Sequence, residues 1–222
     1  MNAPDRRIAR SLAQESLAKG DPTGWFETLY DQAAGLSSNV PWADMRVNPH
    51  FANWLAAHSL DGQRKRALVV GCGLGDDAEE LASRGFQVNA FDVSSTAVDW
   101  CRRRFPKTSV DYQVADLLHP PATWCRAFDF VLEIYTLQVL PAEPRALAAK
   151  NLVEFVAPGG TLLVIARGRE PSDDAGAMPW PLTRDEIASL SGHGLQIVAL
   201  EDFMDDEDPP VRRFCATFHR PA

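Results

Sequence analysis

The residues whose types and spacing could do chemistry lie in one short stretch. Gly71, Gly73 and Gly75 follow the apolar run 68–70 at every second position, and Asp92 ends the next apolar run. Glycine lets the chain turn sharply and lets a ligand approach the backbone, and short apolar runs are typical of buried parallel strands. A carboxylate at a strand end can accept hydrogen bonds from both hydroxyls of a ribose. The pattern therefore predicts a nucleoside-like cofactor at the carboxyl end of a parallel sheet.

Two classes of cofactor compete for this turn. A dinucleotide fingerprint requires Gly-x-Gly-x-x-Gly, so that a pyrophosphate can sit on the helix N-terminus. Here the third glycine comes one residue early, and Asp76 stands where the last glycine should be. Asp76 and Asp77 would repel a pyrophosphate but tolerate a cationic or zwitterionic ligand. S-adenosylmethionine carries a sulfonium, an ammonium and a carboxylate but no phosphate, so both spacing and charge favour it over a dinucleotide or over a turn that only packs tightly.

The glycine turn and the acid after it resemble the cofactor motif of class I S-adenosylmethionine-dependent methyltransferases. The matching residues run Val70-Gly-Cys-Gly-Leu-Gly75 and then Phe91-Asp92. The resemblance covers residues 25 to 218. Many members carry an acid two residues before the first glycine, where this chain has Val69, so contacts to the methionine end are expected from Asp76, Asp77 or the backbone.

Positions before this motif are similar to the thiopurine/tellurite methyltransferase-like group within that superfamily: Trp25, Tyr30, Pro41-Trp42 and Asn48-Pro49. This likeness implies a soft acceptor, such as a thiol or a chalcogen oxyanion. The superfamily resemblance implies an α/β fold with a doubly wound, mostly parallel sheet of seven strands, and an antiparallel C-terminal hairpin at one edge.

Strands and helices alternate from Arg66 onward, which predicts a parallel sheet. We expect strands at 66–71, 88–92, 110–115, 128–134 and 160–166, and helices between them, most clearly at 94–104 and 144–156. The last two strands, 195–203 and 211–219, flank the loop 205–210 and should pair as an antiparallel hairpin.

Further helices are expected before the sheet, at 5–19, from Asp21-Pro22 and from Asn48-Pro49. Ser94 should cap the helix at 94–104, and Thr183 with Glu186 forms the sequence of a capping box. The whole chain, 1–222, is expected to form one domain, in which 1–60 is a helical extension or lid and 61–222 is the cofactor-binding core.

Two further strand ends carry acids. For Asp116 the resemblance implies a hydrogen bond from the adenine amino group, with Leu117 packed on the ring; the alternative is a carboxylate that caps its own turn. Glu133 leaves an apolar strand, and either contacts cofactor or substrate or is a satisfied structural acid. The expected cofactor-binding residues are Trp42, Gly71, Cys72, Gly73, Gly75, Asp77, Asp92, Val93, Asp116, Leu117, Glu133 and Ile134.

The acceptor side is indicated by aromatic residues. Tyr135 lines the pocket, acts as a weak acid or packs in the core. An aromatic face near a sulfonium gains cation–π attraction, so Trp42, in its proline-bearing loop, is interpreted as part of a lid, whereas Trp25 is expected in the core. The expected substrate-binding residues are Tyr30, Trp42, Tyr135, Arg167 and Trp180, and the catalytic candidates are Glu133 and Tyr135.

Arginines lie beside two loops. Arg167, past the fifth strand, either meets an anionic substrate or belongs to an exposed basic turn. Arg212 and Arg213, next to the acidic loop 205–210, are expected to form solvated ion pairs.

Charge and composition narrow the partners. The net charge of −8 at pH 7 argues against a nucleic acid and against an anionic membrane surface. The four cysteines are scattered, without zinc spacing, so we expect no metal and a reducing, cytoplasmic location; Cys72 is interpreted as a small filler of the turn. No apolar stretch is long enough for a membrane span, and the N-terminus does not resemble a secretory signal. The sequence gives no prediction of the oligomeric state.

These observations predict methyl transfer from S-adenosylmethionine, with S-adenosylhomocysteine as product, to a small soft nucleophile. A thiolate or an oxyanion needs no strong base, and no Ser/His/Asp or Cys/His set occurs at suitable spacing. Three alternatives remain open at this point. They are an O- or N-methyltransferase that uses Glu133 or Tyr135 for proton removal, a nicotinamide-dependent oxidoreductase, and a non-catalytic module that binds S-adenosylmethionine.

Overall fold

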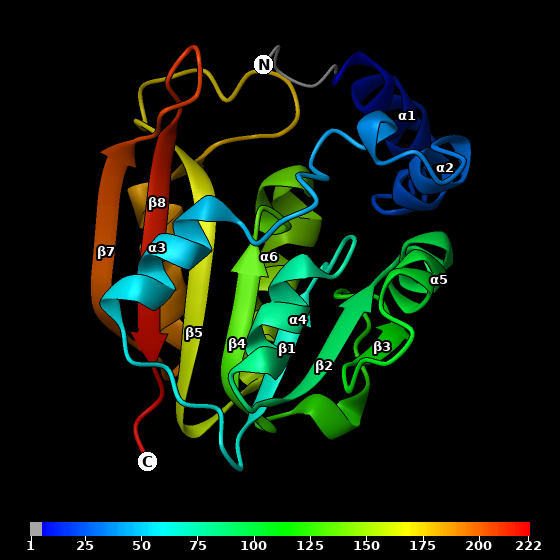
Figure 1. Cartoon of the computed structure of the whole chain (residues 1–222). Helices are drawn as coiled ribbons and strands as arrows, with labels where there is room; N and C mark the ends of the chain where they lie inside the picture. Colours follow the sequence, from blue (N-terminus) through cyan, green and yellow to red (C-terminus); the bar gives the residue numbers. More distant parts are fainter. Residues whose placement is uncertain (1–5) are drawn as a thin grey trace.

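The computed structural model describes residues 6–222. Seven strands form a sheet in the order β3-β2-β1-β4-β5-β8-β7, and the two-residue strand β6 pairs with the end of β5 (Figure 1). The pairs among β1 to β5 are parallel, and β8 is antiparallel to β5 and to β7. The strands are β1 Arg66–Val70, β2 Gln87–Asp92, β3 Asp111–Val114, β4 Phe128–Ile134, β5 Val156–Arg169, β6 Leu182–Thr183, β7 Gln196–Met204 and β8 Arg212–His219. This confirms the predicted doubly wound, mostly parallel sheet with its C-terminal hairpin.

Helices cover both faces of this sheet. One face packs against α3, α4 and α5, and the other packs against α6 and α7. In Figure 1, α3 and α4 lie in front of the strands and α6 lies behind them. The α-helices are α1 Arg7–Ala18, α2 Gly24–Gln32, α3 Pro49–Ala57, α4 Asp76–Ser83, α5 Ser95–Arg104, α6 Ala142–Glu154 and α7 Arg184–Ala188. Short 3-10 turns are η1 Ser37–Asn39, η2 Ala122–Trp124, η3 Leu137–Val139 and η4 Ser189–His193.

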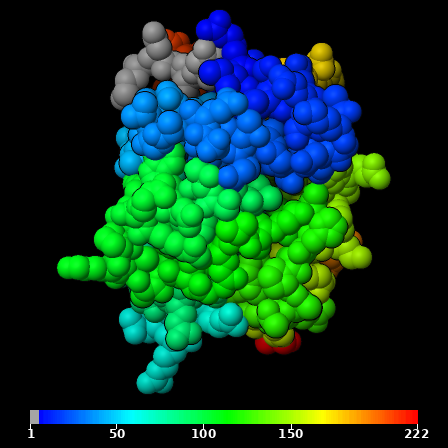
Figure 2. Space-filling view, turned by 90° about the vertical axis from the view of Figure 1, so that its right-hand side faces the viewer, coloured from blue at the N-terminus to red at the C-terminus, as the bar shows by residue number. Residues whose placement is uncertain are grey.

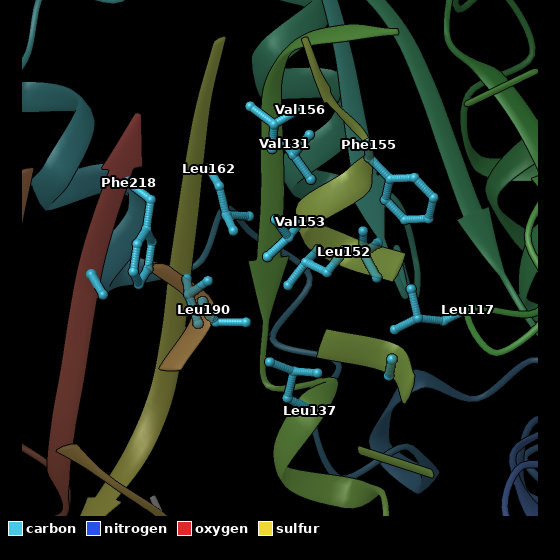
Figure 3. Close-up of a cluster of buried hydrophobic side chains, with 14 of the residues drawn as sticks. Leu117, Val131, Leu137, Leu152, Val153, Phe155, Val156, Leu162, Leu190 and Phe218 are labelled. Atoms are coloured by element: carbon cyan, nitrogen blue, oxygen red, sulfur yellow. The ribbon is translucent and has the colours of Figure 1, made fainter. Parts of the chain in front are cut away.

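The core behind the sheet is built from strand and α6 side chains (Figure 3). Val131 of β4 and Leu162 of β5 face Leu152 and Val153 of α6, and all four are fully buried. Each fully buried aliphatic side chain contributes about 1.5–3 kcal/mol relative to exposure. This core holds the parallel strands in register, so their carboxyl ends meet at one edge of the sheet.

Local signals fixed most element boundaries. The Asn48 side chain accepts from the amides of His50 and Phe51 and so caps α3, Ser94 caps α5, and Thr183 with Glu186 forms the predicted capping box. The second helix begins at Gly24, later than predicted, because the Asp21 carboxylate binds the amides of residues 23 and 24 in a turn before it. Residue 5, where we expected the first helix to begin, lies outside the described residues.

The N-terminal helices form a separate layer at the carboxyl edge of the sheet. Side chains of α1 and α2 share one cluster with Leu74 of the glycine turn, Ala97 and Trp100 of α5, and Met178. In Figure 1, α1 and α2 lie above α5, and Figure 2 shows the N-terminal segment, in blue, covering the green strands and helices below it. A ligand bound at the glycine turn would therefore be covered by this layer.

Candidate cofactor and acceptor site

The glycine turn joins β1 to α4 with three left-handed residues. Gly71, Gly73 and Gly75 have φ of +59°, +55° and +93°. A Cβ on Gly71 would lie 2.5 Å from Thr136 Oγ1, so a larger residue there meets both backbone strain and a steric clash. Over Gly73 the nearest atom is the Tyr30 hydroxyl, at 3.4 Å from such a Cβ. The turn is therefore packed tightly at Gly71 and covered at Gly73 by side chains of the N-terminal layer, at ordinary contact distance.

Asp92 lies at the carboxyl end of β2, opposite this turn. Its two carboxylate oxygens accept from the amides of Gly73 and Ser94, both at 3.0 Å. Burial raises the pKa of Asp92 to about 6, although hydrogen bonds from the amides of Ser94, Gly73 and Val93 oppose that rise. The side chain is thus held rigidly and stays ionised at neutral pH, as a carboxylate that receives a diol must be.

Glu133 lies at the end of β4, next to the glycine turn, since Val70 pairs with Glu133 in the parallel register. Its Oε1 accepts from the amides of Thr136 at 2.7 Å and Leu137 at 2.9 Å. Its Oε2 is buried and has no hydrogen-bond partner among the described residues. Burial raises its pKa to about 7. A buried carboxylate oxygen without a partner is costly and marks a place for a ligand donor.

The two acids at the start of α4 differ in their partners. Asp76 makes a two-pronged ion pair with Arg104, at 2.7 and 2.8 Å. This pair neutralises Asp76, so the repulsion of a pyrophosphate that we expected from this residue is weaker than the sequence suggested. Asp77 accepts from the Asn48 amide at 2.8 Å, and burial raises its pKa to about 7. One oxygen of Asp77 therefore ties the N-terminal segment to the turn.

Aromatic side chains from the N-terminal layer lie over the glycine turn. Trp42 Nε1 donates to the Tyr30 hydroxyl at 2.8 Å, and the Trp42 ring contacts Trp25 and Phe26 edge-on, with centroids 6.0 Å apart in each case. Trp25 and Tyr30 are almost completely buried, and Trp25 packs in the core of the layer as predicted. Trp42 is only partly buried, which agrees with its interpretation as part of a lid.

Glu27 anchors that layer to α5, and no pattern in the sequence pointed to this residue. Its carboxylate accepts from Ser94 Oγ at 2.7 Å, Thr96 Oγ1 at 2.6 Å and the Thr96 amide at 3.2 Å. Partial burial opposes ionisation, but these bonds outweigh it and lower the pKa of Glu27. Since Ser94 also binds Asp92, the lid is coupled directly to the expected ribose site.

The remaining predicted cofactor residues are spread around the carboxyl edge. Asp116 binds the Leu118 amide at 2.8 Å and His119 Nδ1 at 2.9 Å, which is the turn-capping alternative. Leu117 is buried in the core cluster of α6. Val93, Ile134 and Cys72 lie at the ends of β2, β4 and β1, half-buried. The structure brings these three next to Asp92, Glu133 and the glycine turn and gives Asp116 a local partner.

A second group of polar side chains lies beyond β4. The Arg213 guanidinium lies over the Tyr135 ring, 4.9 Å from its centroid, and Arg213 pairs with Arg167 across β5 and β8. Tyr135 has φ of +65°, an unusual value for an aromatic residue and one often retained at functional sites. Burial raises the pKa of its hydroxyl. The predicted acceptor residues Tyr135 and Arg167 are therefore neighbours.

The expectation of solvated ion pairs holds for Arg212 and is wrong for Arg213. Arg212 binds Asp202 at the surface. Arg213 is 2% exposed and binds Asp205, which is equally buried, at 2.6 Å. Arg213 lies on the face of β8 that carries Cys215, and Arg212 lies on the face that carries Phe214. Both faces are buried further along the strand, so the difference comes from the partners of Arg213, which are Asp205 and the Tyr135 ring.

Trp180 belongs to the segment between β5 and β6. Its amide donates to the Gln138 carbonyl at 2.7 Å, and its ring packs on the N-terminal layer. The buried Gln138 side chain also receives the Arg167 amide at 2.7 Å. Gln138, which the sequence did not single out, thus fixes both Arg167 and the segment that carries Trp180.

Residues 67–160 match the family described as Methyltransferase domain. The chain is 26% identical over 204 residues to a protein named probable thiol methyltransferase 2 from Arabidopsis thaliana. The aligned region covers 90% of this chain and 85% of that protein. The chain is an S-adenosylmethionine-dependent methyltransferase. This decides against the nicotinamide-dependent alternative, and S-adenosylhomocysteine is the product formed from the cofactor.

Two other matches of this methyltransferase either cover a smaller part of the related protein or have a lower sequence identity. It is 33% identical over 161 residues to a ubiquinone biosynthesis O-methyltransferase of Xanthomonas campestris, and that match spans 68% of this chain and 65% of that protein. Its fold superposes on the N-methyltransferase NodS of Bradyrhizobium japonicum, solved with S-adenosylhomocysteine, with a TM-score of 0.67 at 20% identity over 88% of this chain and all of that one.

The site suits this cofactor on its own evidence. The buried carboxylates of Asp77, Asp92 and Glu133 surround the turn. The unpartnered Oε2 of Glu133 could accept a hydrogen bond from a ligand donor such as an ammonium group. In the described part of the chain, no group of three or more His, Cys, Asp or Glu side chains is arranged to hold a metal ion. None of the described helices is long and apolar enough to cross a membrane.

Proposed function

We propose that this methyltransferase acts on a small soft nucleophile that it binds as an anion, a thiolate or a selenium or tellurium oxyanion. The observation that carries the proposal is a pair of neighbouring arginines, the half-buried Arg167 and the buried Arg213, beside Tyr135. The match to a thiol methyltransferase along most of both chains supports it. The likeness to the thiopurine/tellurite methyltransferase-like group stays a prediction.

We assign the cofactor as follows. Asp92 holds the ribose diol, and Gly71, Gly73 and the free oxygen of Glu133 face the methionine end. Tyr30 and Trp42 of the lid exclude water from the turn, and Val93, Leu117 and Ile134 line the adenosine. When bound, S-adenosylmethionine supplies an activated methyl carbon whose bond to the sulfonium sulfur breaks as the acceptor's lone pair forms the new bond.

The chain's own residues then mainly align the two reactants. Holding two reactants in the correct orientation can lower the activation barrier by about 7–11 kcal/mol. A thiolate arrives already deprotonated, so no proton has to be moved, and the arginines stabilise its charge before transfer. We place the enzyme in the cytoplasm, since its four cysteines are free thiols, and we expect neither nucleic acid nor membrane as partner.

A second candidate is O-methylation of a small hydroxylated compound. Its support is the pKa of Glu133, raised to about 7 by burial, together with one oxygen free to receive a proton. A carboxylate with that pKa suits a general base. The match to an O-methyltransferase points the same way.

One assay separates the candidates. The purified protein is incubated with S-adenosylmethionine and a panel of thiols, selenite, tellurite, catechols and amines, and release of S-adenosylhomocysteine is measured. Turnover with thiols or the oxyanions supports the proposal. Turnover with catechols or amines alone contradicts it. Cofactor binding without turnover on any acceptor would leave only the non-catalytic module.

A further inference from the structure

The acidic loop between β7 and β8 places a carboxylate on the proposed acceptor site. Glu207 pairs with Arg213 Nη2 through one oxygen, and its other oxygen lies 3.6 Å from Arg167 Nη2. Arg167 and Arg213 are direct neighbours across β5 and β8. The Glu207 carboxylate therefore bridges two guanidinium groups at the edge where β4 ends.

The two acids of this loop that bind Arg213, Asp205 and Glu207, have different roles. Asp205 is buried, accepts from Arg213 Nε at 2.6 Å, and receives the amides of Glu207 and Val211 at 3.1 and 2.8 Å. It is a fixed structural partner of Arg213. The Glu207 side chain is 46% exposed, and among the described residues it is the carboxylate that lies within ion-pair distance of Arg167. Glu207 is therefore the partner that can leave.

A third guanidinium group lies close to this pair. Arg6 interacts electrostatically with Arg213 and with Glu207, so among the described residues three guanidinium groups gather around the Glu207 carboxylate. Burial, with the neighbouring charges of Arg6 and Arg213, lowers the pKa of Arg167 to about 10. Partly desolvated guanidinium groups so close together favour an anion between them, and they bind anions through strong charge-assisted hydrogen bonds.

The arginine site is joined to the cofactor turn. The Arg213 guanidinium lies on the Tyr135 ring, and the Tyr135 hydroxyl interacts with the Asn48 side chain. The Asn48 amide is held by Asp77 at the start of α4. An anion on the arginines therefore lies at the same carboxyl edge of the sheet as the glycine turn, on the side of β4 away from Asp92.

We propose that the acceptor anion binds between Arg167 and Arg213 in the position taken here by the Glu207 carboxylate, and that Glu207 is a built-in competitor which the acceptor displaces. The occupant is a small anion, because Glu207 itself presents only a carboxylate group to the two arginines; its soft character follows from the proposed function. This rests on the proposed function. On this proposal the acidic loop controls access of the acceptor to the two arginines and selects acceptors that carry a negative charge.

The test measures the dissociation constant of thiocyanate, a small soft anion, by calorimetry on the full chain saturated with S-adenosylhomocysteine. Glu207→Gln, which removes the competing charge at an exposed position, should lower this constant by about threefold or more, and Arg167→Gln should raise it about tenfold or more. Asp206→Asn makes the same charge change on the same loop at an exposed residue that, among the described residues, forms no ion pair with either arginine, and should stay within about twofold of the parent. Arg213 is left unchanged because it is buried against Asp205.

Unchanged thiocyanate binding in both Glu207→Gln and Arg167→Gln would overturn the proposal, as would equal effects of Glu207→Gln and Asp206→Asn. The proposed function fails separately. If thiocyanate binding follows the expected pattern but no thiol or oxyanion is methylated, the anion site is supported and the proposed reaction is wrong.

Discussion

The Trp42 indole donates its N–H to the Tyr30 hydroxyl at 2.8 Å, and that hydroxyl lies directly over Gly73. This hydrogen bond between two residues of the N-terminal layer thus orients the Trp42 ring beside the turn that we assign to the cofactor. The positions are twelve residues apart, and neither is held near Gly73 by its own secondary structure.

Tyr30→Phe should loosen the lid without unfolding it. The change leaves the Trp42 N–H without its partner at a half-buried position, which costs about 1 kcal/mol in the free energy of unfolding. Affinity for S-adenosylhomocysteine should fall several-fold, since Trp42 no longer has a fixed orientation. Urea unfolding and calorimetry measure the two effects. Unchanged affinity would show that the lid does not depend on this bond.

Asp92→Asn tests the ribose assignment. The amide keeps the size of the side chain but loses one acceptor and the charge, so affinity for S-adenosylhomocysteine should fall by about tenfold or more. Ser94→Ala is the comparison variant, because it removes the cap of α5 and one hydrogen bond to Glu27 but leaves the backbone amide that binds Asp92. It should lower stability by about 1 kcal/mol with a smaller effect on affinity. A larger effect of Ser94→Ala would place the diol elsewhere.

The sequence predicted the sheet and the glycine turn well because each depends on local rules. Apolar runs of strand length, glycines at positive φ, and the caps at Asn48 and Thr183 act over a few residues. The positions of strand ends then follow from the parallel register. Asp92 and Glu133 could be named as candidates for that reason.

The contacts that join distant segments were not predictable in the same way. Glu27 reaches Ser94 and Thr96 across 67 and 69 residues, and nothing near Glu27 in the sequence distinguishes it from a surface acid. Arg213 was assigned to the surface because acids lie next to it. Its burial depends on contacts with Asp205 and with the Tyr135 ring, which the folding of the hairpin against the sheet brings together.

The raised pKa of Glu133 predicts how stability depends on pH. Its folded pKa of about 7 lies above the ordinary value of 4.5, so its contribution is complete below pH 4.5 and is lost as the pH rises through 7. The loss for this one group is about 3 kcal/mol. Urea unfolding between pH 4.5 and 8 should show declining stability, and Glu133→Gln should flatten that decline. An equal slope in the variant would contradict the assignment, since Asp77 and Asp92 would then account for all of it.

Cofactor binding should act on the same group in the opposite direction. S-adenosylhomocysteine carries an ammonium group, which favours ionised Glu133, so binding at pH 6.5 should release protons and affinity should increase up to about pH 7. Calorimetry in two buffers of different ionisation enthalpy measures the number of protons released. Glu133→Gln should reduce this number. The same proton release in the variant would show that the cofactor does not face Glu133.

Glu27→Gln tests the coupling between lid and cofactor site. Glu27 accepts three hydrogen bonds at the start of α5, and its lowered pKa means that the charged form is the stabilising one. A neutral amide replaces charge-assisted bonds and should lower the free energy of unfolding by about 1–2 kcal/mol. Because Ser94 is shared with Asp92, affinity for S-adenosylhomocysteine should fall as well.

Glu15→Gln is the control for this change, since Glu15 is exposed on α1 and binds only Ser11 among the described residues. It should leave both quantities within experimental error. Stability of the parent chain should also decrease as the pH falls below 4.5 through the folded pKa of Glu27, and Glu27→Gln should not show that part of the decrease. Reduced stability with normal affinity would separate the lid from the cofactor site and restrict Glu27 to holding α2 on α5.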